Sequence, residues 1–422
     1  MSDPLELARF LAPLRGAPRR LLLEPALETL AASDAGVFER RPRDVPSGFT
    51  LRRLVVLPGT GGGHVLLDGT DPEVFRAGTA LLPRGRALSR LATGFVRESS
   101  RLGLHRLAPR RLALVERADA PGRALHQRFP GLPDEISWNV ASGVPGRDQK
   151  RIVQFVTRRG RVEAFAKIAL TDSARARVEH EAELLVRLAA LGIRGVPALL
   201  GVERGTASTM LVQGALRGTR SPGILGRAHA NFLGALAERT RRMLPLCEIE
   251  SQRATRAGLA ELAGRADPEW LETFAALERA LLAAAGQMRL PCALAHGDFT
   301  PWNVLVEGSQ ARAFDWEHAR LSAPPGHDAL HFALQQAVLV DRRAPELLLA
   351  HLRECCAEHL GPLPFVALAA YVLDIAVADE RMQLEQRSPF AQVEWLRRAR
   401  LELARALLAP ALASARAQGG RT

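Results

Sequence analysis

The chain has 422 residues and a net charge of +12, and 47% of its residues are hydrophobic. This length and composition predict two or three domains with substantial cores. The most apolar runs are too short and too interrupted for a membrane span, and the N-terminus lacks the basic and apolar regions of a secretory signal, so we expect no membrane partner. The four cysteines have no metal-binding spacing, and together these features favour a cytoplasmic location.

The basic residues are scattered along the chain rather than gathered in one stretch. The chain contains a single Tyr and no nucleic-acid-binding motif, so we expect no nucleic-acid partner. The positive net charge of the chain is compatible with anionic small-molecule ligands.

Residues 1–130 predict a small α+β domain. Strands are expected at residues 49–57, 64–68 and 112–116, and helices at residues 5–32 and 77–101. The glycine cluster from Gly59 to Gly63 lacks the last glycine of a dinucleotide-binding motif and precedes a strand, so it predicts a hairpin tip. We expect this domain to serve docking, substrate presentation or self-association, and to end in a linker at residues 120–131.

Residues 131–217 predict a set of strands that carries an unusual cation. Strands are expected at residues 136–140, 151–157, 162–170 and 206–212, and a helix at residues 174–191. Lys167 is one of only two Lys among 57 basic residues. Its use on an apolar strand indicates that a compact point charge is needed there, although a Lys that reaches solvent is the alternative.

Residues 218–422 predict a mainly helical region that contains one hairpin. Helices are expected at residues 224–243 and 268–288. Asn303 opens an apolar run, turn residues follow, and a second apolar pair leads into Asp315, so the hairpin brings Asn303 and Asp315 to the same end. Their amide and carboxylate oxygens are hard ligands that suit Mg²⁺.

Asp298 lies just before this hairpin, in the segment His296-Gly297-Asp298-Phe299-Thr300-Pro301-Trp302-Asn303. Gly297 and Pro301 keep the segment from becoming a helix, so the Asp298 carboxylate can face the metal without binding it. The hydroxyl group that receives a phosphoryl group would lie beside this carboxylate. The spacing therefore predicts a site that moves a phosphoryl group.

The segments His296 to Asn303 and Ala313 to Glu317 resemble the H-G-D-x-x-x-x-N and hydrophobic-D-[WF]-E signatures of the aminoglycoside phosphotransferases and choline kinase-like enzymes, which are small-molecule relatives of the protein kinases. The resemblance covers roughly residues 131–400. It implies an α+β, bilobal protein-kinase-like fold, with an antiparallel-sheet N-lobe at residues 131–217 and a mainly helical C-lobe at residues 218–422, preceded by the α+β domain of residues 1–130.

This resemblance assigns the catalytic and metal-binding roles. Asp298 would accept or orient the acceptor proton, while Asn303 and Asp315 would hold Mg²⁺. The family's helix motif matches the segment that begins at Glu181, so Glu181 would pair with Lys167, and Lys167 would reach the α and β phosphates of ATP. The fallback partners for Lys167 are Glu179 and Glu183.

The resemblance also assigns the remaining nucleotide contacts. Ser142 and Gly143 would contact phosphates, although an ordinary hairpin loop is the alternative, and Gln213 would contact adenine through its backbone. Asp328 would cap an apolar helix. The candidate residues for contact with the acceptor molecule are Asp374, Asp379, Glu380 and Arg381. The alternative is that these are ordinary solvent-exposed charges on helices.

The implied activity is transfer of the γ-phosphate of ATP, with Mg²⁺, to a hydroxyl of a small molecule such as a sugar, an amino sugar or an amino alcohol. The alternative is a kinase-shaped nucleotide-sensing or scaffolding module without transfer activity. All the required residue types are present, which favours the enzyme.

Overall fold

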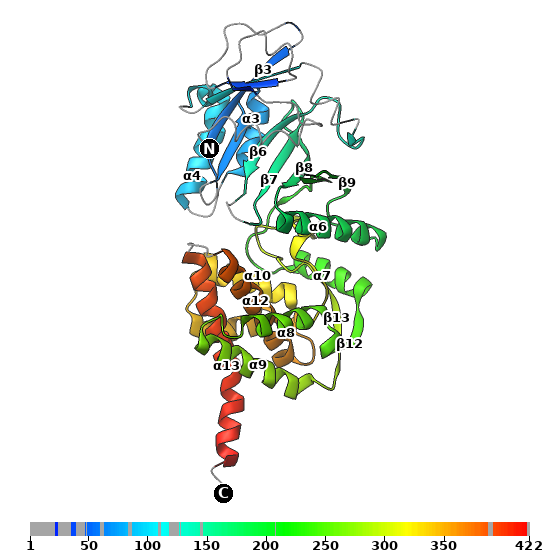
Figure 1. Cartoon of the computed structure of the whole chain (residues 1–422), viewed down its shortest axis with the longest axis vertical. Helices are drawn as coiled ribbons and strands as arrows, with labels where there is room; N and C mark the ends of the chain where they lie inside the picture. The colour runs from blue at the N-terminus through cyan, green and yellow to red at the C-terminus, as the bar shows by residue number, and fades with distance from the viewer. Residues whose placement is uncertain are drawn as a thin grey trace. The chain divides into compact units, whose positions relative to one another are not determined.

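The structure, a computed structural model, describes residues 22–23, 35–38, 47, 49–59, 63–82, 87–108, 111–117, 126, 128–143, 147–206, 208–386 and 391–419. The chain divides into two compact units. Unit 1 comprises Met1–Glu183 and Pro197–Ala215, and unit 2 comprises Leu184–Val196 and Leu216–Thr422. Figure 1 labels the helices and strands of both units.

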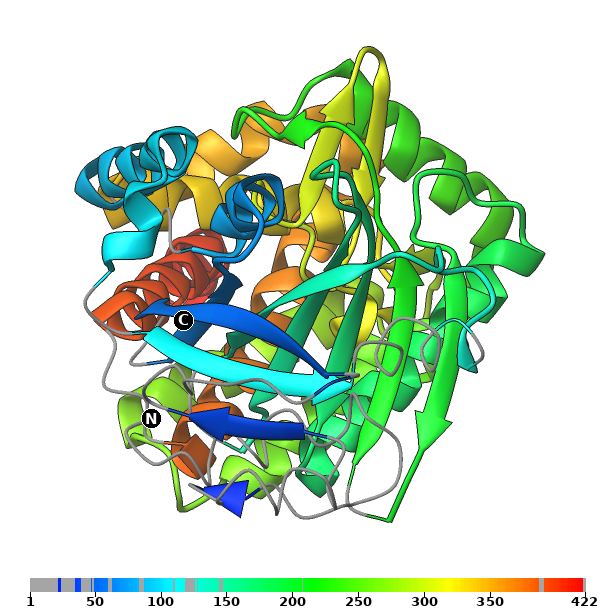
Figure 2. The same cartoon turned by 90° about the horizontal axis from the view of Figure 1, so that it is seen from above.

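One ten-stranded sheet forms the body of unit 1, with the strand order β1-β2-β5-β3-β4-β6-β7-β8-β10-β9. The strands are β1 (Leu22–Leu23), β2 (Ala35–Phe38), β3 (Phe49–Pro58), β4 (His64–Asp68), β5 (Arg111–Arg117), β6 (Ser137–Ser142), β7 (Lys150–Val156), β8 (Val162–Ala169), β9 (Leu199–Arg204) and β10 (Thr209–Gly214). Neighbouring strands are antiparallel except β1 and β2, which are parallel. Figure 2 shows β3 and β5 side by side, in blue and cyan.

The alternating side chains of the central strands bury one face of this sheet. Trp138, Val140, Val153 and Phe155 belong to one core cluster and are at most 3% exposed. Successive side chains of a strand point to opposite faces, so this alternation builds the core. The helices of unit 1 are α3 (Pro72–Gly78), α4 (Ala87–Ser99) and α6 (Asp172–Ala190), the last of which continues into unit 2.

The sheet runs across the boundary that the sequence predicts near residue 130. Strand β4 pairs with β6, so that Val65 lies opposite Ala141. The fully buried Asn139 adds side-chain contacts, because it accepts a hydrogen bond from the Asp68 N–H at 2.9 Å and donates to the Val74 carbonyl at 3.0 Å. The described residues before 130 and the strands after it therefore share one unit, while the three-part domain division stays a prediction.

The expected strands of residues 1–130 are present, while the two expected helices are contradicted where the structure describes them. The expected strands appear as β3, β4 and β5. The single helix expected at residues 77–101 is wrong, because α3 ends at Gly78, a 3₁₀ turn follows at Thr79–Leu81, and α4 begins only at Ala87. The Gly59 N–H donates to the Gly63 carbonyl at 2.8 Å, as a tight connection requires. Within the helix expected at residues 5–32, the described residues Leu22–Leu23 form strand β1, so the expectation is wrong there. The rest of that segment, the tip residues 60–62 and most of the linker lie outside the described residues.

Unit 2 is mainly helical, as the resemblance implies. Its helices are α7 (Arg227–Thr240), α8 (Glu250–Leu262), α9 (Pro268–Ala285), α10 (His327–Gln335), α11 (Leu348–Cys355), α12 (Pro364–Gln386) and α13 (Ala391–Gly419). Two three-stranded sheets accompany them, formed by β11 (Thr219–Arg220), β12 (Arg242–Pro245), β13 (Arg289–Ala295), β14 (Val304–Glu307), β15 (Gln310–Ala313) and β16 (Arg320–Ala323). The helix expected at residues 224–243 ends earlier, because Arg242 and Met243 pair with β13 as a strand.

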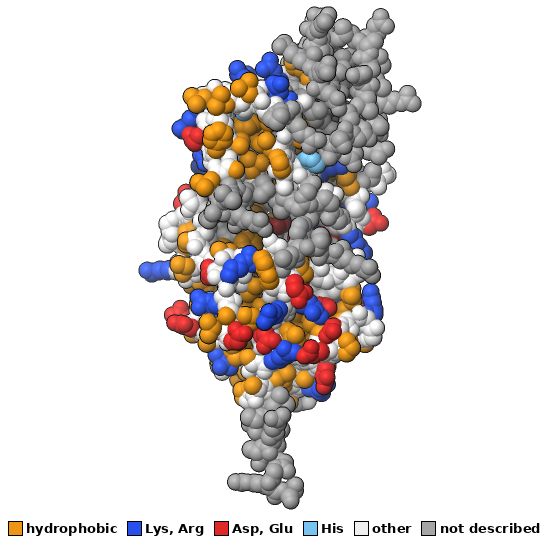
Figure 3. Space-filling view, turned by 90° about the vertical axis from the view of Figure 1, so that its left-hand side faces the viewer, with side chains coloured by type: hydrophobic (Ala, Val, Ile, Leu, Met, Phe, Trp, Pro, Cys, Tyr) orange, Lys and Arg blue, Asp and Glu red, His pale blue; other side chains and the backbone are white. Residues whose placement is uncertain are grey.

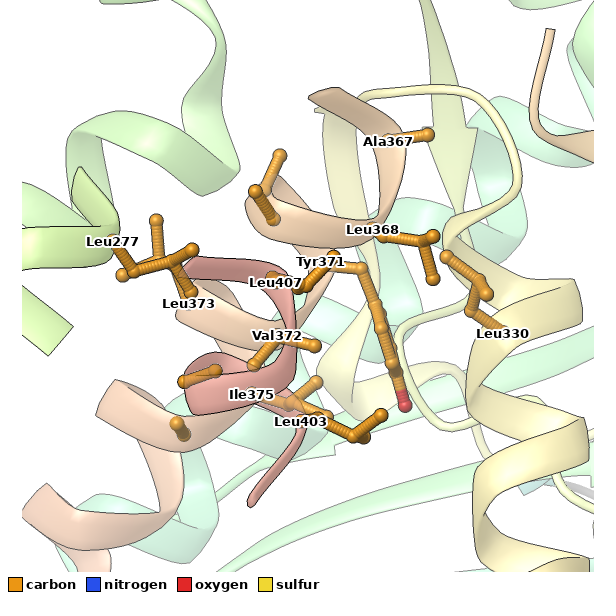
Figure 4. Close-up of a cluster of buried hydrophobic side chains, with 14 of the residues drawn as sticks. Leu277, Leu330, Ala367, Leu368, Tyr371, Val372, Leu373, Ile375, Leu403 and Leu407 are labelled. Carbon is orange, nitrogen blue, oxygen red and sulfur yellow. The ribbon is translucent and has the colours of Figure 1, made fainter. Parts of the chain in front are cut away.

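A large hydrophobic core fixes the helices of unit 2 against one another. Helix α12 supplies its centre, where Leu368, Tyr371 and Leu373 are at most 1% exposed. Figure 4 shows the Tyr371 side chain in this cluster together with Leu330 and Leu368. Because α10 and α12 both pack into this core, the polar side chains that these two helices carry project from a rigid backbone.

The surface of unit 1 carries exposed apolar side chains around α4. Leu91 and Phe95 on this helix and Leu102 and Leu107 in the turns that follow are 70–77% exposed. Figure 3 shows hydrophobic side chains gathered on this part of the surface. None of the described helices is both long and apolar enough to cross a bilayer.

Candidate functional site

Lys167 and Glu181 form a buried ion pair in unit 1. Lys167 lies on β8, opposite Ile152 of β7 and Leu211 of β10. Its Nζ lies 2.7 Å from Oε1 and 2.6 Å from Oε2 of Glu181 on α6. The Lys167 side chain is 7% exposed and that of Glu181 is fully buried. The predicted pairing is therefore confirmed, while the role of the pair in binding ATP stays a prediction.

The two fallback carboxylates lie elsewhere. Glu179 accepts a hydrogen bond from the Thr209 hydroxyl at 3.3 Å, and Glu183 is exposed. Glu181 is the residue of the three that points at Lys167, because side chains two positions apart face different sides of a helix.

Ser142 and Gly143 lie at the end of β6, where the hairpin to β7 begins. The Ser142 hydroxyl accepts a hydrogen bond from the His64 N–H at 2.6 Å and donates to the His64 carbonyl at 3.1 Å. The Gly143 N–H donates to the Lys150 carbonyl at 2.8 Å, and a Cβ on Gly143 would lie 2.8 Å from that oxygen. These contacts connect β6 to its neighbouring strands, and they account for a hydroxyl at position 142 and a glycine at position 143. The assignment of Ser142 and Gly143 to phosphate contacts stays a prediction.

Gln213 lies near the end of β10, where the pairing with β9 shifts register. Its side chain is 4% exposed. In the next two residues the Gly214 N–H donates to the Ala198 carbonyl at 2.8 Å and the Ala215 N–H to the Glu163 carbonyl at 2.9 Å. Unit 1 ends at Ala215, two residues beyond Gln213, and the adenine contact of Gln213 stays a prediction.

In unit 2, the expected hairpin forms and places Asn303 and Asp315 at its open end. Strands β14 and β15 pair with Val304 opposite Ala313, and the Phe314 N–H donates to the Asn303 carbonyl at 3.1 Å. Asp315 then adopts a left-handed backbone with φ of 74°. A non-glycine residue in this region carries strain, and such strain concentrates at functional sites.

The orientation of the Asn303 amide suits a metal ligand. Its Nδ2 donates to the Asp298 carbonyl at 3.1 Å and to Asp298 Oδ2 at 2.8 Å. The amide oxygen therefore points the other way, and no described residue donates a hydrogen bond to it. An amide oxygen beside a carboxylate is a donor set that fits Mg²⁺.

The loop that carries Asp298 folds against the segment after the hairpin. Gly297 has a φ of 79°, and a Cβ at this position would lie 2.0 Å from the His318 carbonyl oxygen. Glycine is therefore required by both the backbone conformation and the close approach. The buried His296 connects the two segments, because its Nε2 lies 3.0 Å from the Phe314 carbonyl and its Nδ1 accepts from the Asp298 N–H at 3.3 Å. His296 therefore supports the Asp298 loop.

Asp328 anchors the same loop from helix α10. Its carboxylate accepts hydrogen bonds from the His296 N–H at 2.7 Å and from the Gly297 N–H at 3.0 Å. The expectation that Asp328 caps its own helix is wrong, because the N-cap of α10 is Gly326 and Asp328 lies inside the first turn. Its carboxylate instead satisfies two backbone N–H groups of the Asp298 loop, which would otherwise be buried without partners.

A buried charge network holds Asp328 in its ionised form. His327 Nε2 lies 2.9 Å from Asp374 Oδ2, and His327 Nδ1 lies 3.7 Å from Asp328 Oδ1. Burial by itself would lower the pKa of His327, but the Asp328 and Asp374 carboxylates outweigh it and raise the pKa to about 9. Burial likewise opposes ionisation of Asp328, and the neighbouring His327 nevertheless keeps the pKa of Asp328 below its ordinary value.

Both carboxylate oxygens of Asp298 have partners. Asn303 donates to Oδ2 at 2.8 Å, and His331 Nε2 lies 3.2 Å from Oδ1. The Asp298 side chain is 31% exposed and that of His331 is 8% exposed. The carboxylate is thus held in one orientation while it stays accessible, as a group that must meet an acceptor hydroxyl requires.

His331 and its partner Tyr371 were missed by the sequence reasoning. The Tyr371 hydroxyl lies 3.3 Å from His331 Nδ1. One signal in the sequence pointed to these histidines. His327 and His331 are four positions apart, so they share a face of the helix that also carries Asp328. Nothing in the sequence placed that face against Asp298.

The four candidate acceptor contacts are all engaged within unit 2. Asp374 bonds His327, and Asp379 forms an ion pair with Arg400. Glu380 pairs with Arg397 at 3.0 Å and Arg381 with Glu261 at 2.7 Å. These charges stabilise the helical core or its surface, and their role as acceptor contacts stays a prediction.

Comparison with known proteins places this chain among phosphotransferases. A model described as the phosphotransferase enzyme family matches residues 146–366, a little over half of the chain. A search of curated proteins finds no match.

Solved structures similar to this chain include aminoglycoside phosphotransferases. The apo crystal structure of a thermostable mutant of aminoglycoside phosphotransferase APH(4)-Ia shares 16% identity with a TM-score of 0.48, over 68% of this chain and 98% of that chain. The ADP-bound structure of APH(2'')-Ib shares 14% identity with a TM-score of 0.42, over 67% of this chain and 97% of that chain. The gentamicin complex of APH(2'')-IIa shares 16% identity with a TM-score of 0.43, over 67% and 94%.

Proposed function

The chain belongs to the phosphotransferase enzyme family, and we propose that it transfers the γ-phosphoryl group of ATP to a hydroxyl group of a small molecule. The proposed acceptor class is a sugar, an amino sugar or an amino alcohol. The observation that carries the proposal is the Asp298 carboxylate, which is 31% exposed and has each oxygen hydrogen bonded to a different side chain.

Asp298 would orient the acceptor hydroxyl and take its proton. As the acceptor oxygen bonds to the γ-phosphorus, the bond from that phosphorus to the bridging oxygen breaks and ADP leaves, while the acceptor proton passes to the Asp298 carboxylate. General-base assistance of this kind contributes roughly 10² to 10⁴ in rate.

Asn303 and Asp315 would hold Mg²⁺, which neutralises developing charge on the phosphates when it is bound. The support for this role is the Asn303 amide oxygen, which its own Nδ2 contacts turn away from Asp298. Lys167, fixed by Glu181, would contact the α and β phosphates of ATP, with Ser142, Gly143 and the Gln213 backbone as further nucleotide contacts. Positioning and charge neutralisation supply most of the rate in such transfers.

The test is transfer of labelled γ-phosphate from ATP to a pooled extract of polar metabolites, with wild type and Asp298→Asn side by side. We expect a labelled product with wild type, and a rate at least about 100-fold lower with the variant, while Mg-ATP binding stays nearly unchanged. Equal rates in the two proteins would overturn the role of Asp298. No product from wild type that still binds Mg-ATP would favour a nucleotide-sensing or scaffolding module, or a macromolecular partner of residues 1–130.

A further inference from the structure

The Asp298 carboxylate has a second support that no signature motif contains. His331 lies on helix α10, and its Nε2 is 3.2 Å from Asp298 Oδ1. On the other side of the imidazole ring, Nδ1 is 3.3 Å from the Tyr371 hydroxyl on helix α12. Three side chains from a loop and two helices therefore form one chain of hydrogen bonds, Asp298 to His331 to Tyr371.

The chemistry of the two ends fixes the protons of this chain. An ionised carboxylate can only accept hydrogen bonds, so the Nε2 of His331 must donate to Asp298. Tyr371 is fully buried, and burial raises the pKa of its hydroxyl well above the ordinary value, so the O–H stays intact and can donate. The Nδ1 lone pair, 3.3 Å away, can accept this bond. A His331 tautomer with its proton on Nε2 and a lone pair on Nδ1 satisfies both contacts.

Rigid elements hold this histidine. The Tyr371 ring meets His331 edge-on, with ring centroids 6.1 Å apart and planes at 82°, and it meets His327 in the same manner at 5.3 Å and 87°. Tyr371 is 1% exposed and packs in the helical core with Leu330 and Leu368 (Figure 4). The ring and hydroxyl of Tyr371 thus limit the rotation of His331.

The contact also fixes the plane of the carboxylate. Asn303 binds Oδ2 from the hairpin and His331 binds Oδ1 from the helix, so rotation of the Asp298 side chain would break one bond or the other. Each carboxylate oxygen keeps a further lone pair, which can accept a hydrogen bond from the hydroxyl group that is to be phosphorylated. The orientation is set before any acceptor arrives, which is what a preorganised catalytic group needs.

We propose that His331, with its tautomer fixed by Tyr371, is a positioning residue that holds the Asp298 carboxylate toward the acceptor hydroxyl. This inference rests on the proposed phosphoryl transfer. His331 gains and loses no proton in the step, because the acceptor proton ends on Asp298. The neighbouring charged residues, His327, Asp328 and Asp374, bond one another or the loop backbone rather than His331.

Two substitutions of similar size distinguish the effect of the His331 hydrogen-bond donor from the effect of its side-chain volume. His331→Gln keeps an N–H donor near the position of Nε2, whereas His331→Leu fills the space without a donor. With water as the acceptor, ADP release gives kcat and the KM for ATP. We expect His331→Leu to lower kcat roughly 10- to 100-fold with KM for ATP unchanged, as misplacement of a catalytic group does, and His331→Gln to stay within a few-fold of wild type.

A merely structural role predicts a different outcome. It would lower the melting temperature of both variants and leave kcat per folded molecule equal to wild type. A folded His331→Leu protein with unchanged kcat, or a folded His331→Gln protein as slow as His331→Leu, would overturn the proposal.

Tyr371→Phe tests whether Tyr371 acts through His331. Removal of the hydroxyl should lower kcat several-fold in the wild-type background. It should have no further effect in the His331→Gln background, because Gln has no ring nitrogen for the hydroxyl to fix. Additive losses would contradict the chain of hydrogen bonds, since independent residues add and coupled ones do not.

A spectroscopic measurement separates this inference from the proposed function. In protein labelled with ¹⁵N in its histidines, the His331 signals are those that disappear in His331→Gln. We expect the Nε2–H tautomer in wild type and a mixture of tautomers in Tyr371→Phe. An Nδ1–H tautomer in wild type would overturn the inference whatever the activity. The expected tautomer in a wild-type protein that labels no product in the metabolite extract would instead count against the proposed function.

Discussion

Lys167 and Asp298 are both charged side chains with fixed positions, yet the two units hold them in different ways. Lys167 lies on a strand and meets Glu181 of a helix in one direct pair. Asp298 lies on a loop, and its position depends on Asn303, on His331 and on the carboxylate of Asp328 beneath the loop backbone. A regular element satisfies its own backbone, whereas a buried loop must find partners for its N–H groups elsewhere.

This difference predicts which supports can be replaced. A buried ion pair between regular elements can often be exchanged for apolar side chains of similar volume with little loss of stability. Asp328 cannot be exchanged in this way, because the backbone N–H groups of His296 and Gly297 would lose their acceptor. The three predictions below test this contrast, from the largest expected effect to the smallest.

The largest effect is expected for Asp328→Asn. The substitution replaces one of the two acceptor oxygens for the loop with a donor and removes one of the two buried carboxylates beside the charged His327, so we expect the free energy of unfolding to fall by about 3–5 kcal/mol. Denaturant unfolding followed by Trp fluorescence measures the change. Asp341→Asn is the control, because Asp341 is exposed and accepts only from Gln336, and surface changes cost about 0.5 kcal/mol or less. Equal effects of the two substitutions would contradict the anchoring role.

An intermediate effect is expected when both members of the unit 1 pair are replaced. Lys167→Met with Glu181→Leu should unfold within about 1 kcal/mol of wild type, while Lys167→Met alone should be less stable because it removes the cation that neutralises the buried Glu181 carboxylate. ATP affinity should fall roughly 10- to 100-fold in the double variant, because a charged hydrogen bond contributes about 1.5–3 kcal/mol. Calorimetric titration with Mg-ATP measures this loss. Unchanged affinity would contradict the assignment of Lys167 to the phosphates.

The smallest effect, taken per pH unit, is a pH dependence of stability that comes from His327. Its pKa is raised to about 9 in the folded protein from an ordinary value of 6.5, so the folded state keeps a proton that the unfolded state has lost between these values. Stability from this group is complete below pH 6.5 and is lost as the pH rises through 9, by at most about 1.4 kcal/mol per pH unit. Unfolding measured at pH 6.5, 7.5, 8.5 and 9.5 checks this. His327→Gln should flatten the profile, and an unchanged slope would contradict the assignment.

The same contrast explains how much of the site could be predicted from the sequence. Strand alternation and the rarity of Lys predicted Lys167, the resemblance to the family's helix motif predicted its partner Glu181, and a hairpin pattern predicted that Asn303 and Asp315 share one end. Those rules are local or rest on a recognisable motif. The contact of His331 with Asp298 joins positions 33 residues apart through tertiary packing, and no periodicity in the sequence encodes it.

The fold shows a similar limit. The α+β class and the strands β3, β4 and β5 followed from alternation, and the break between α3 and α4 was missed. Residues 1–130 were expected to form a small α+β domain of their own, yet their strand β4 pairs with β6. Sequence patterns indicate where strands lie, but they do not indicate which strands become neighbours, and the pairing of β4 with β6 is such a choice.

That pairing has a consequence for any shortened form of the protein. A chain cut to residues 131–422 would keep the segment that matches the family but would lose β4, so β6 would become an edge strand with a row of unpaired backbone groups around Val140 and Ala141. Such exposed edges template association with other chains. We therefore expect a chain without β4 to aggregate more readily than the full chain, because β4 is the strand that covers this edge of β6.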